Sequence, residues 1–255
     1  MKRVATSIVL ALFALYAIFL APQWLFIAIV VLIACLCYNE YASIASASGV
    51  QGALYLGYAA GLIAMARLDT LPLLALALLT FALVSRDLSK ALGFSGATVL
   101  GVIYVFLSWR FAIDLRQLSP YWLFYALSIN WAGDVAAYYT GRSFGRHKLA
   151  PRVSPGKSWE GAAGSMLVSV AYGVWFGEQA HLGLSLPAMF ALSAIANAAG
   201  QVGDLVESVL KRGAGVKDSG HLLPGHGGFL DRLDSSLFTL PVVYHFLVWV
   251  KGAVR

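Results

Sequence analysis

The sequence contains few charged residues for its size. Asp, Glu, Lys and Arg make up 12% of its 255 residues, whereas soluble domains average about 25%. Hydrophobic residues make up 60%, and they fall in long runs comparable with the roughly 20 residues that cross a bilayer. This composition excludes an ordinary soluble domain and predicts an all-α fold, a polytopic membrane helix bundle.

Cysteine is also scarce. Cys35 and Cys37 are separated by one residue inside an apolar run, which predicts buried thiols rather than a disulfide or a metal site. The first apolar run follows Lys2 and Arg3, is longer than a signal-peptide core, and has no small-residue cleavage site before Gln23. We interpret it as a retained span.

Breaks at proline, glycine and charge divide the chain into about nine predicted transmembrane helices. They are Val4–Leu20, Leu25–Ala45, Ala53–Ala66, Leu71–Val84, Ala97–Phe111, Tyr121–Thr140, Ala162–Phe176, Ser185–Gln201 and Leu237–Val250. The third and fourth are short and are joined by Arg67–Asp69, so a tilted or re-entrant pair is an alternative for them.

The basic residues indicate the orientation of the bundle. With a cytoplasmic N-terminus, 13 of the 18 Lys and Arg residues fall in inside segments and five fall outside. This bias agrees with the positive-inside rule. It places a basic surface where anionic lipid headgroups and nucleotide polyphosphates are found. Nucleic acid is not expected as a partner, because no soluble basic domain is present.

The first 120 residues contain no repeat and no motif with an assignable role. Glu40 is the exception, because a carboxylate at the end of a span is costly unless it is solvated, paired or functional.

The first polar loop runs from Asp134 to Gly161. Asp134 is expected near the inner end of a helix that Gly141 and Gly145 break, and Arg142, Arg146, His147, Lys148 and Arg152 follow. The Ser-Pro-Gly-Lys-Ser stretch at 154–158 then offers hydroxyls, a turn and an ammonium group before the next span. This combination suits phosphate, although the Walker A spacing is absent. A loop that is merely positive-inside is the alternative.

The second polar loop, Gly203–Ser235, is more specific. Asp204, Glu207, Ser208 and Lys211 share one face of the helix that continues from the eighth span, and glycines at 213 and 215 are expected to end that helix. Half of the chain's 12 acidic residues lie in this loop or at Asp134. Several carboxylates and cations at one membrane face suit Mg²⁺-assisted chemistry on phosphates.

The segment from Ser208 to Asp234 resembles the signature of the phosphatidate cytidylyltransferase (CDP-diacylglycerol synthase) family. The positions that match are Ser208, Lys211, Arg212, Lys217, Asp218, His226, Gly227, Gly228, Asp231, Arg232 and Asp234. The D-x-x-A-Y-x-x-G-x-x-F-G stretch from Asp134 and the S-P-x-K-S-W-E-G stretch from Ser154 resemble the same family. The resemblance covers about the last half of the chain, and Gly156 stands where relatives are expected to carry Lys or another residue.

The resemblance implies an enzyme that transfers the cytidylyl group of CTP to phosphatidic acid, giving CDP-diacylglycerol and pyrophosphate. It implies Mg²⁺ as cofactor, with Asp204, Asp231, Asp218 and Asp234 as expected ligands. The implied catalytic residues are Asp204, Asp231, Lys211, Arg212, Lys217, Asp218, Arg232 and His226. The implied substrate-binding residues are Asp134, Ser154, Lys157, Ser158, Ser208, Gly227 and Gly228. A second cation and a homodimer are left open.

The chain is interpreted as one membrane-embedded domain, 1–255, with spans of unassigned role in 1–120 and catalytic spans and loops in 121–255. The expected location is the bacterial inner membrane, with the active site facing the cytoplasm and membrane lipids around it. The alternatives are a CTP-dependent lipid kinase of the dolichol or phytol kinase type, a cytidylyltransferase for an ether-linked isoprenoid lipid phosphate and, from another class, an anionic-solute transporter. A transporter is disfavoured because its charges would lie at mid-membrane in broken helices.

Overall fold

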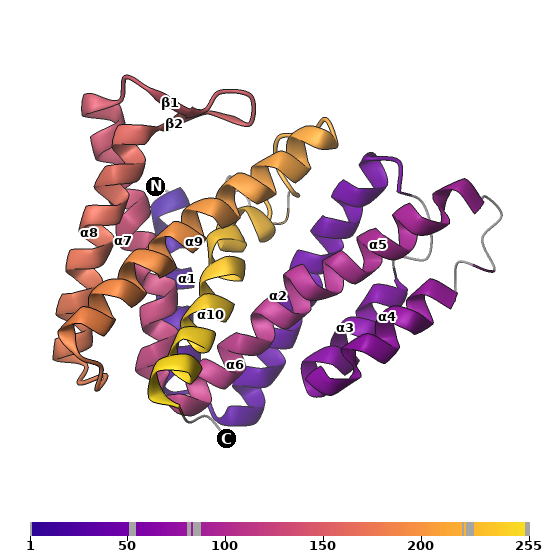
Figure 1. Cartoon of the computed structure of the whole chain (residues 1–255), viewed down its shortest axis with the longest axis horizontal. Helices are drawn as coiled ribbons and strands as arrows, with labels where there is room; N and C mark the ends of the chain where they lie inside the picture. Colours follow the sequence, from indigo (N-terminus) through magenta and orange to yellow (C-terminus); the bar gives the residue numbers. More distant parts are fainter. Residues whose placement is uncertain are drawn as a thin grey trace. The chain divides into compact units, whose positions relative to one another are not determined.

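The computed structural model describes residues 2–50, 55–80, 83, 88–220, 222 and 227–252. Its regular structure is almost entirely helical (Figure 1). The α-helices are α1 (Lys2–Phe19), α2 (Gln23–Ala47), α3 (Leu56–Ala66), α4 (Leu71–Thr80), α5 (Ala91–Gly101), α6 (Ser108–Leu118), α7 (Pro120–Phe144), α8 (Trp159–Gln179), α9 (Leu186–Gly213) and α10 (Leu230–Lys251). A π-helical turn, Val102–Leu107, joins α5 to α6, and 3₁₀ turns occur at Leu68–Thr70 and Leu88–Lys90.

The described part of each predicted span lies on a helix, which confirms the all-α membrane class. Four stretches of the described chain are long and apolar enough to cross a membrane: Gln23–Ala47, Ala91–Leu118, Leu186–Gly213 and Leu230–Val250. Helices α3 and α4 have only 11 and 10 residues. The count of nine spans and the cytoplasmic N-terminus therefore stay predictions.

Large apolar side chains are exposed along several helices. Leu73 on α4, Leu167 on α8 and Trp249 on α10 are 69%, 72% and 81% exposed. Apolar surface of this extent is unfavourable in water but is the normal outer face of a helix in hydrocarbon. These faces fit contact with lipid tails.

The fold separates into two compact units. The first takes in Met1–Ile113 and Leu210–Arg232, and the second takes in Asp114–Val209 and Leu233–Arg255. In the first unit, α3 and α4 pack beside α5 and the π-helical turn (Figure 1). In the second unit, α7 and α8 lie side by side over their whole length.

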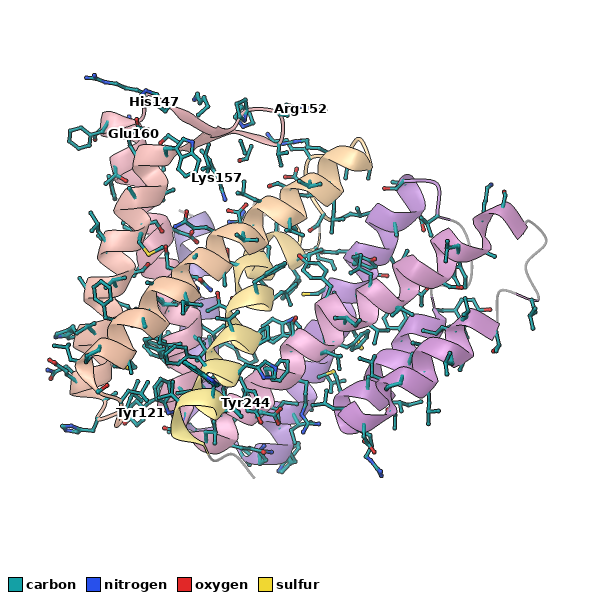
Figure 2. The ribbon with its side chains drawn as sticks, in the orientation of Figure 1. Tyr121, His147, Arg152, Lys157, Glu160 and Tyr244 are labelled. Atoms are coloured by element: carbon teal, nitrogen blue, oxygen red, sulfur yellow. The ribbon has the colours of Figure 1, made fainter. Side chains whose placement is uncertain are left out.

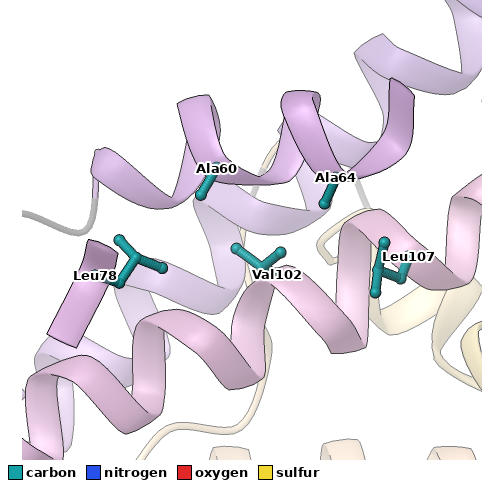
Figure 3. Close-up of a cluster of buried hydrophobic side chains, with 5 residues drawn as sticks. All are labelled: Ala60, Ala64, Leu78, Val102 and Leu107. Atoms are coloured by element: carbon teal, nitrogen blue, oxygen red, sulfur yellow. The ribbon is translucent and has the colours of Figure 1, made fainter. Parts of the chain in front are cut away.

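Small residues allow α3 to pack closely in the first unit. Ala60 and Ala64 face Val102 and Leu107, with Leu78 of α4 alongside (Figure 3). On the same helix, side chains at Gly57 and Gly61 would collide with aromatic rings of neighbouring helices. Four-residue spacing of small residues is a common means of bringing membrane helices together.

Two expectations about the first polar loop need correction. Helix α7 continues through Gly141 and ends at Phe144, with Gly145 as its C-cap, so only the second glycine breaks it. The loop then forms a two-stranded antiparallel hairpin, β1 (Lys148–Ala150) and β2 (Ser154–Ser158), at one end of the α7–α8 pair (Figure 1). The strands pair Lys148 with Ser158 and Ala150 with Ser154, a register that no alternating pattern in the sequence predicts.

Candidate functional site

The second unit contains a pocket of about 170 Å³ between the hairpin, α7, α8, α9 and α10. Its lining residues are Asp134, Ala137, Tyr138, Gly141, Leu149, Gly156, Lys157, Ser158, Gly161, Ala162, Ser165, Gln201, Asp204 and Ser235. The pocket therefore brings together Asp134, Lys157 and Ser158 from the first polar loop and Asp204 from the second. We call these four residues, with Gln201, the pocket cluster.

A lysine ammonium lies among the carboxylates of the pocket cluster. Lys157 extends from β2 (Figure 2), and its Nζ lies 2.6 Å from Asp204 Oδ2 on α9. Asp134 on α7 lies close enough to both to interact with their charges. The side chains of Lys157 and Asp204 are 27% and 32% exposed, so both charges remain accessible to a ligand in the pocket.

The base of the hairpin is tied to the start of α8. His147 Nδ1 lies 2.6 Å from Glu160 Oε1 (Figure 2). The Trp159 amide donates to the His147 carbonyl at 2.9 Å. The hydrogen bond from His147 lowers the pKa of Glu160 to about 2, with backbone amides contributing. Ser158 is the N-cap of α8, because its Oγ accepts from the Gly161 amide. These contacts hold Lys157 and Ser158, the last two residues of β2, beside the start of α8.

Buried polar side chains link α7, α8 and α9 behind the pocket. Ser169 Oγ donates to the Ile129 carbonyl at 3.1 Å, so this hydroxyl must accept from Asn197 Nδ2, which lies 2.9 Å away. Asn197 Nδ2 also reaches Ser165 Oγ at 2.9 Å. The orientation of the Asn197 amide is thereby fixed, with Oδ1 on its other side.

The fixed amide of Asn197 in turn orients Gln201. Asn197 Oδ1 accepts from Gln201 Nε2 at 2.6 Å, and Nε2 also donates to the Ala162 carbonyl at 3.2 Å. Both hydrogens of the Gln201 amide are therefore used inside the bundle. The atom left for the pocket is Oε1, an acceptor suited to a hydrogen-bond donor or a cation.

The first unit contains a second polar cluster, built around Asp231 at the start of α10. Asp231 Oδ1 lies 2.5 Å from Lys211 Nζ, and Oδ2 accepts from the Gly228 amide at 2.8 Å and the Ser219 amide at 3.0 Å. Side-chain exposure is 12% for Lys211 and 8% for Asp231. We call Lys211, Ser219, Gly228 and Asp231 the signature cluster.

Glu40 of α2 lies against the signature cluster. Its side chain is buried, with 2% exposure, and accepts from Ser219 Oγ at 2.7 Å, the Phe229 amide at 3.0 Å and the Leu230 amide at 2.8 Å. A buried carboxylate with three donors is satisfied, which explains how this acidic residue is tolerated inside the apolar helix α2, which continues to Ala47.

The remaining predicted site residues are distributed as follows. Arg212, Lys217, Asp218 and Arg232 are exposed, Ser154 and Ser208 are half-buried, Asp234 is buried, and Gly227 has a left-handed φ of +83°. His226 lies outside the described residues. Ser154 pairs across the hairpin with Ala150 and is not among the pocket-lining residues.

The four predicted metal ligands fall in both units. Asp204 and Asp234 belong to the second unit, and Asp218 and Asp231 belong to the first. Within the described residues no three His, Cys, Asp or Glu side chains form a group that could hold a metal ion. The ligand assignment therefore stays a prediction.

The sequence interpretation missed Gln201, Ser165 and Ser235 as pocket residues. Gln201 lies three residues before Asp204, hence on the same face of α9, and this spacing was the available signal. Ser165 and Ser235 carry no comparable signal, because single serines are common in membrane helices.

Comparison with known proteins identifies the family of the chain. Residues 1–250 match the model of the cytidylyltransferase family. A phosphatidate cytidylyltransferase of Bacillus subtilis is 41% identical over 155 residues, which are 60% of this chain and 58% of that protein. One of Haemophilus influenzae is 42% identical over 132 residues, 50% of this chain and 46% of that protein. One of Staphylococcus saprophyticus is 36% identical over 152 residues, 60% of this chain and 58% of that protein.

The matched stretches thus span about half the length of these relatives. The family match, in contrast, extends over nearly the whole chain and takes in both polar clusters. The chain therefore belongs to the cytidylyltransferase family.

Proposed function

We propose that the protein transfers the cytidylyl group of CTP to phosphatidic acid, giving CDP-diacylglycerol and pyrophosphate. The observation that carries the proposal is the match to relatives named phosphatidate cytidylyltransferase, at 36% to 42% identity. The pocket cluster and the signature cluster support it, because both place lysine ammonium groups beside carboxylates, as chemistry on polyphosphates requires.

The reaction needs charge control more than it needs a strong base. An oxygen of the phosphatidate phosphate bonds to the α-phosphorus of CTP, the bond from that phosphorus to the bridging oxygen breaks, and pyrophosphate leaves with the electron pair. The attacking oxygen already carries negative charge, so no strong general base is required to deprotonate it. The main barrier is the approach of two polyanions, which cations lower.

We assign phosphate binding to the cations of both clusters. Lys157 and Ser158 of the hairpin would hold phosphate oxygens in the pocket, and Lys211 would do so beside Asp231. The exposed Arg212, Lys217 and Arg232 are suited to further phosphate contacts, and the guanidinium groups of the two arginines can each bind two phosphate oxygens at once.

The oxygen donors of the pocket fit Mg²⁺. The carboxylates of Asp134 and Asp204, with Gln201 Oε1, are the hard ligands that this ion prefers. When bound there, Mg²⁺ would neutralise charge on the CTP phosphates. Lys157 would then exchange its contact with Asp204 for one with a phosphate oxygen, because an ammonium group and a metal ion compete for the same carboxylate.

We further propose the nine-span topology, with both polar loops at the cytoplasmic face of an inner membrane. A site at this interface would keep the acyl chains of the lipid in hydrocarbon while its headgroup meets water-soluble CTP.

Product analysis tests the proposed function. Purified protein in mixed micelles would be incubated with CTP, Mg²⁺, phosphatidic acid and an unphosphorylated lipid alcohol, and the lipids analysed by mass spectrometry. We expect phosphatidic acid to gain one cytidylyl group, and we expect a chelator to stop the reaction. An unchanged phosphatidic acid pool, or product formed from an unphosphorylated lipid alcohol instead, would refute the assignment.

A further inference from the structure

The carboxylate of Glu40 works as an N-cap for a helix that begins 190 residues later in the chain. The first amides of any helix lack partners within it, and the Phe229 and Leu230 amides at the start of α10 donate to the two oxygens of Glu40. A carboxylate at this end also interacts favourably with the helix dipole. Glu40 thus fixes where α10 begins.

Ser219 connects Glu40 to Asp231. The Ser219 hydroxyl donates to Glu40 Oε2 at 2.7 Å and accepts from the Asp231 amide at 3.3 Å. The Ser219 amide donates to the Asp231 carboxylate, which also holds Lys211. A displacement of the Glu40 carboxylate would therefore move both the backbone and the carboxylate environment of Asp231.

Two glycines of the same segment pack directly on Glu40. A Cβ atom at Gly220 would lie 2.5 Å from Glu40 Oε1, and one at Gly228 would collide with Glu40 Oε2 and with Ser219 Oγ. Such distances are shorter than van der Waals contact. Gly220 and Gly228 therefore lie directly against this one carboxylate, with no room for a side chain at either position.

We propose that Glu40 is a positioning residue of the reaction, which holds Asp231 and Lys211 in their working geometry through Ser219 and the start of α10. The inference rests on the proposed function, because the catalytic roles of Asp231 and Lys211 come from it. Glu40 contacts neither substrate in this account, so its loss affects kcat more than KM.

The test compares Glu40→Gln with a matched control, Glu178→Gln. Both change the same atoms, but Glu178 is exposed near the end of α8. Glutamine keeps the size of Glu40 and replaces one acceptor oxygen with a donor group that faces other donors. We expect Glu40→Gln to lower kcat at least about tenfold with little change in KM for CTP, and Glu178→Gln to match the wild type.

Hydrogen exchange followed by mass spectrometry supplies a second readout that does not need activity. We expect Glu40→Gln to speed exchange at the amides of Ser219, Phe229 and Leu230 while α7 and α8 keep wild-type protection. Glu40→Asp, which keeps the charge, should recover part of the protection and of kcat. The double variant Glu40→Gln/Ser219→Ala should be no slower than Glu40→Gln alone, because both substitutions break one chain of contacts.

The inference would be overturned if these amides exchanged in Glu40→Gln at the wild-type rate. It would also be overturned if Glu40→Gln lost protection at these amides but kept the wild-type kcat. If Glu40→Gln loses protection throughout the protein, the inference is tested with Ser219→Ala instead, because this variant removes a single hydroxyl. The readouts are again kcat and the exchange of these amides. If the wild type itself transfers no cytidylyl group, the proposed function fails. Exchange in Glu40→Gln at the wild-type rate would, separately, show that Glu40 does not position this segment.

Discussion

Asp204 and Asp231 are each held by a lysine ammonium, in different surroundings. The Lys157–Asp204 pair is about 30% exposed, whereas the Lys211–Asp231 pair is about 10% exposed. A partly solvated pair contributes little to stability, whereas removing one partner of a buried pair leaves an uncompensated charge. Substitution of the two aspartates should therefore change the free energy of unfolding by different amounts, whereas both substitutions should lower turnover.

We predict that Asp204→Asn and Asp231→Asn each lower turnover about 100-fold or more, because each removes a charge that acts on the phosphates. Asp231→Asn should also lower the free energy of unfolding by about 3 kcal/mol, and Asp204→Asn by less than about 1 kcal/mol. Turnover and denaturant unfolding in detergent check both. Asp69→Asn, at an exposed pair with Arg67, is the control. Full activity in either variant would show that the aspartate concerned has no role in turnover.

The hairpin should loosen as the pH falls from 4.5 to about 2. The pKa of Glu160 falls from an ordinary 4.5 to about 2 through its bond with His147. A lowered pKa stabilises the fold above pH 4.5, and this stabilisation is lost as the pH falls through about 2. A spin label at Arg152→Cys, on the exposed turn, should keep its mobility from pH 7 to about pH 4.5 and gain mobility below.

The control for this prediction is the same label in a Glu160→Gln background, where Glu160 cannot ionise. Its mobility should be high and independent of pH over the same range. Equal pH profiles in both backgrounds would show that another group holds the hairpin.

Individual residues differed in how far the sequence could predict them. Asp134, Lys157, Ser158 and Asp204 were all named from the residue types of the two polar loops and from the family resemblance, and the structure brings them to one pocket. Glu40 stood out because an acidic residue in an apolar helix needs a partner. The identity of that partner could not be predicted, because Ser219 lies 179 residues away and tertiary folding alone brings them together.

Among the elements, helices were easier to predict than the hairpin. Long apolar runs leave no alternative to helices in a membrane. The 148–158 segment has no alternating pattern, and Pro155 and Gly156 argue against a strand. The segment nonetheless forms two paired strands. Pairing of Lys148 with Ser158 and the contact of His147 with Glu160 close the loop at its base.

The start of α10 offers a test at the scale of one element. We predict that Gly228→Ala destabilises this helix end and lowers activity, because the new methyl group would overlap Glu40 and Ser219. Gly96→Ala on α5 is the control, since nothing lies within 4 Å of its new Cβ, and it should be neutral or stabilising by up to about 1 kcal/mol. Thermal unfolding in detergent measures both, and equal melting temperatures would contradict the packing described.

For the molecule as a whole, the sequence predicted a membrane bundle, and the orientation remains to be tested. We predict that Arg152 and Lys217 face one side of the membrane and Asp69 faces the other, as the distribution of basic residues indicates. All three are exposed. Single cysteines at these positions, in a background without Cys35 and Cys37, would be labelled in sealed vesicles by a membrane-impermeant maleimide. Labelling of Arg152→Cys and Lys217→Cys from opposite sides would reject the topology.

The central claim concerns which phosphorus of CTP is attacked, and one measurement decides it. The protein is incubated with phosphatidic acid, Mg²⁺ and CTP labelled at either the α- or the γ-phosphate, and the lipid fraction is counted. Cytidylyl transfer carries the α label into the lipid and releases the γ label as pyrophosphate. With an unphosphorylated lipid alcohol also present, a lipid kinase would carry the γ label into the lipid and leave the α label in CDP. We predict label in the lipid from the α position alone, and lipid labelled only from the γ position would contradict the account.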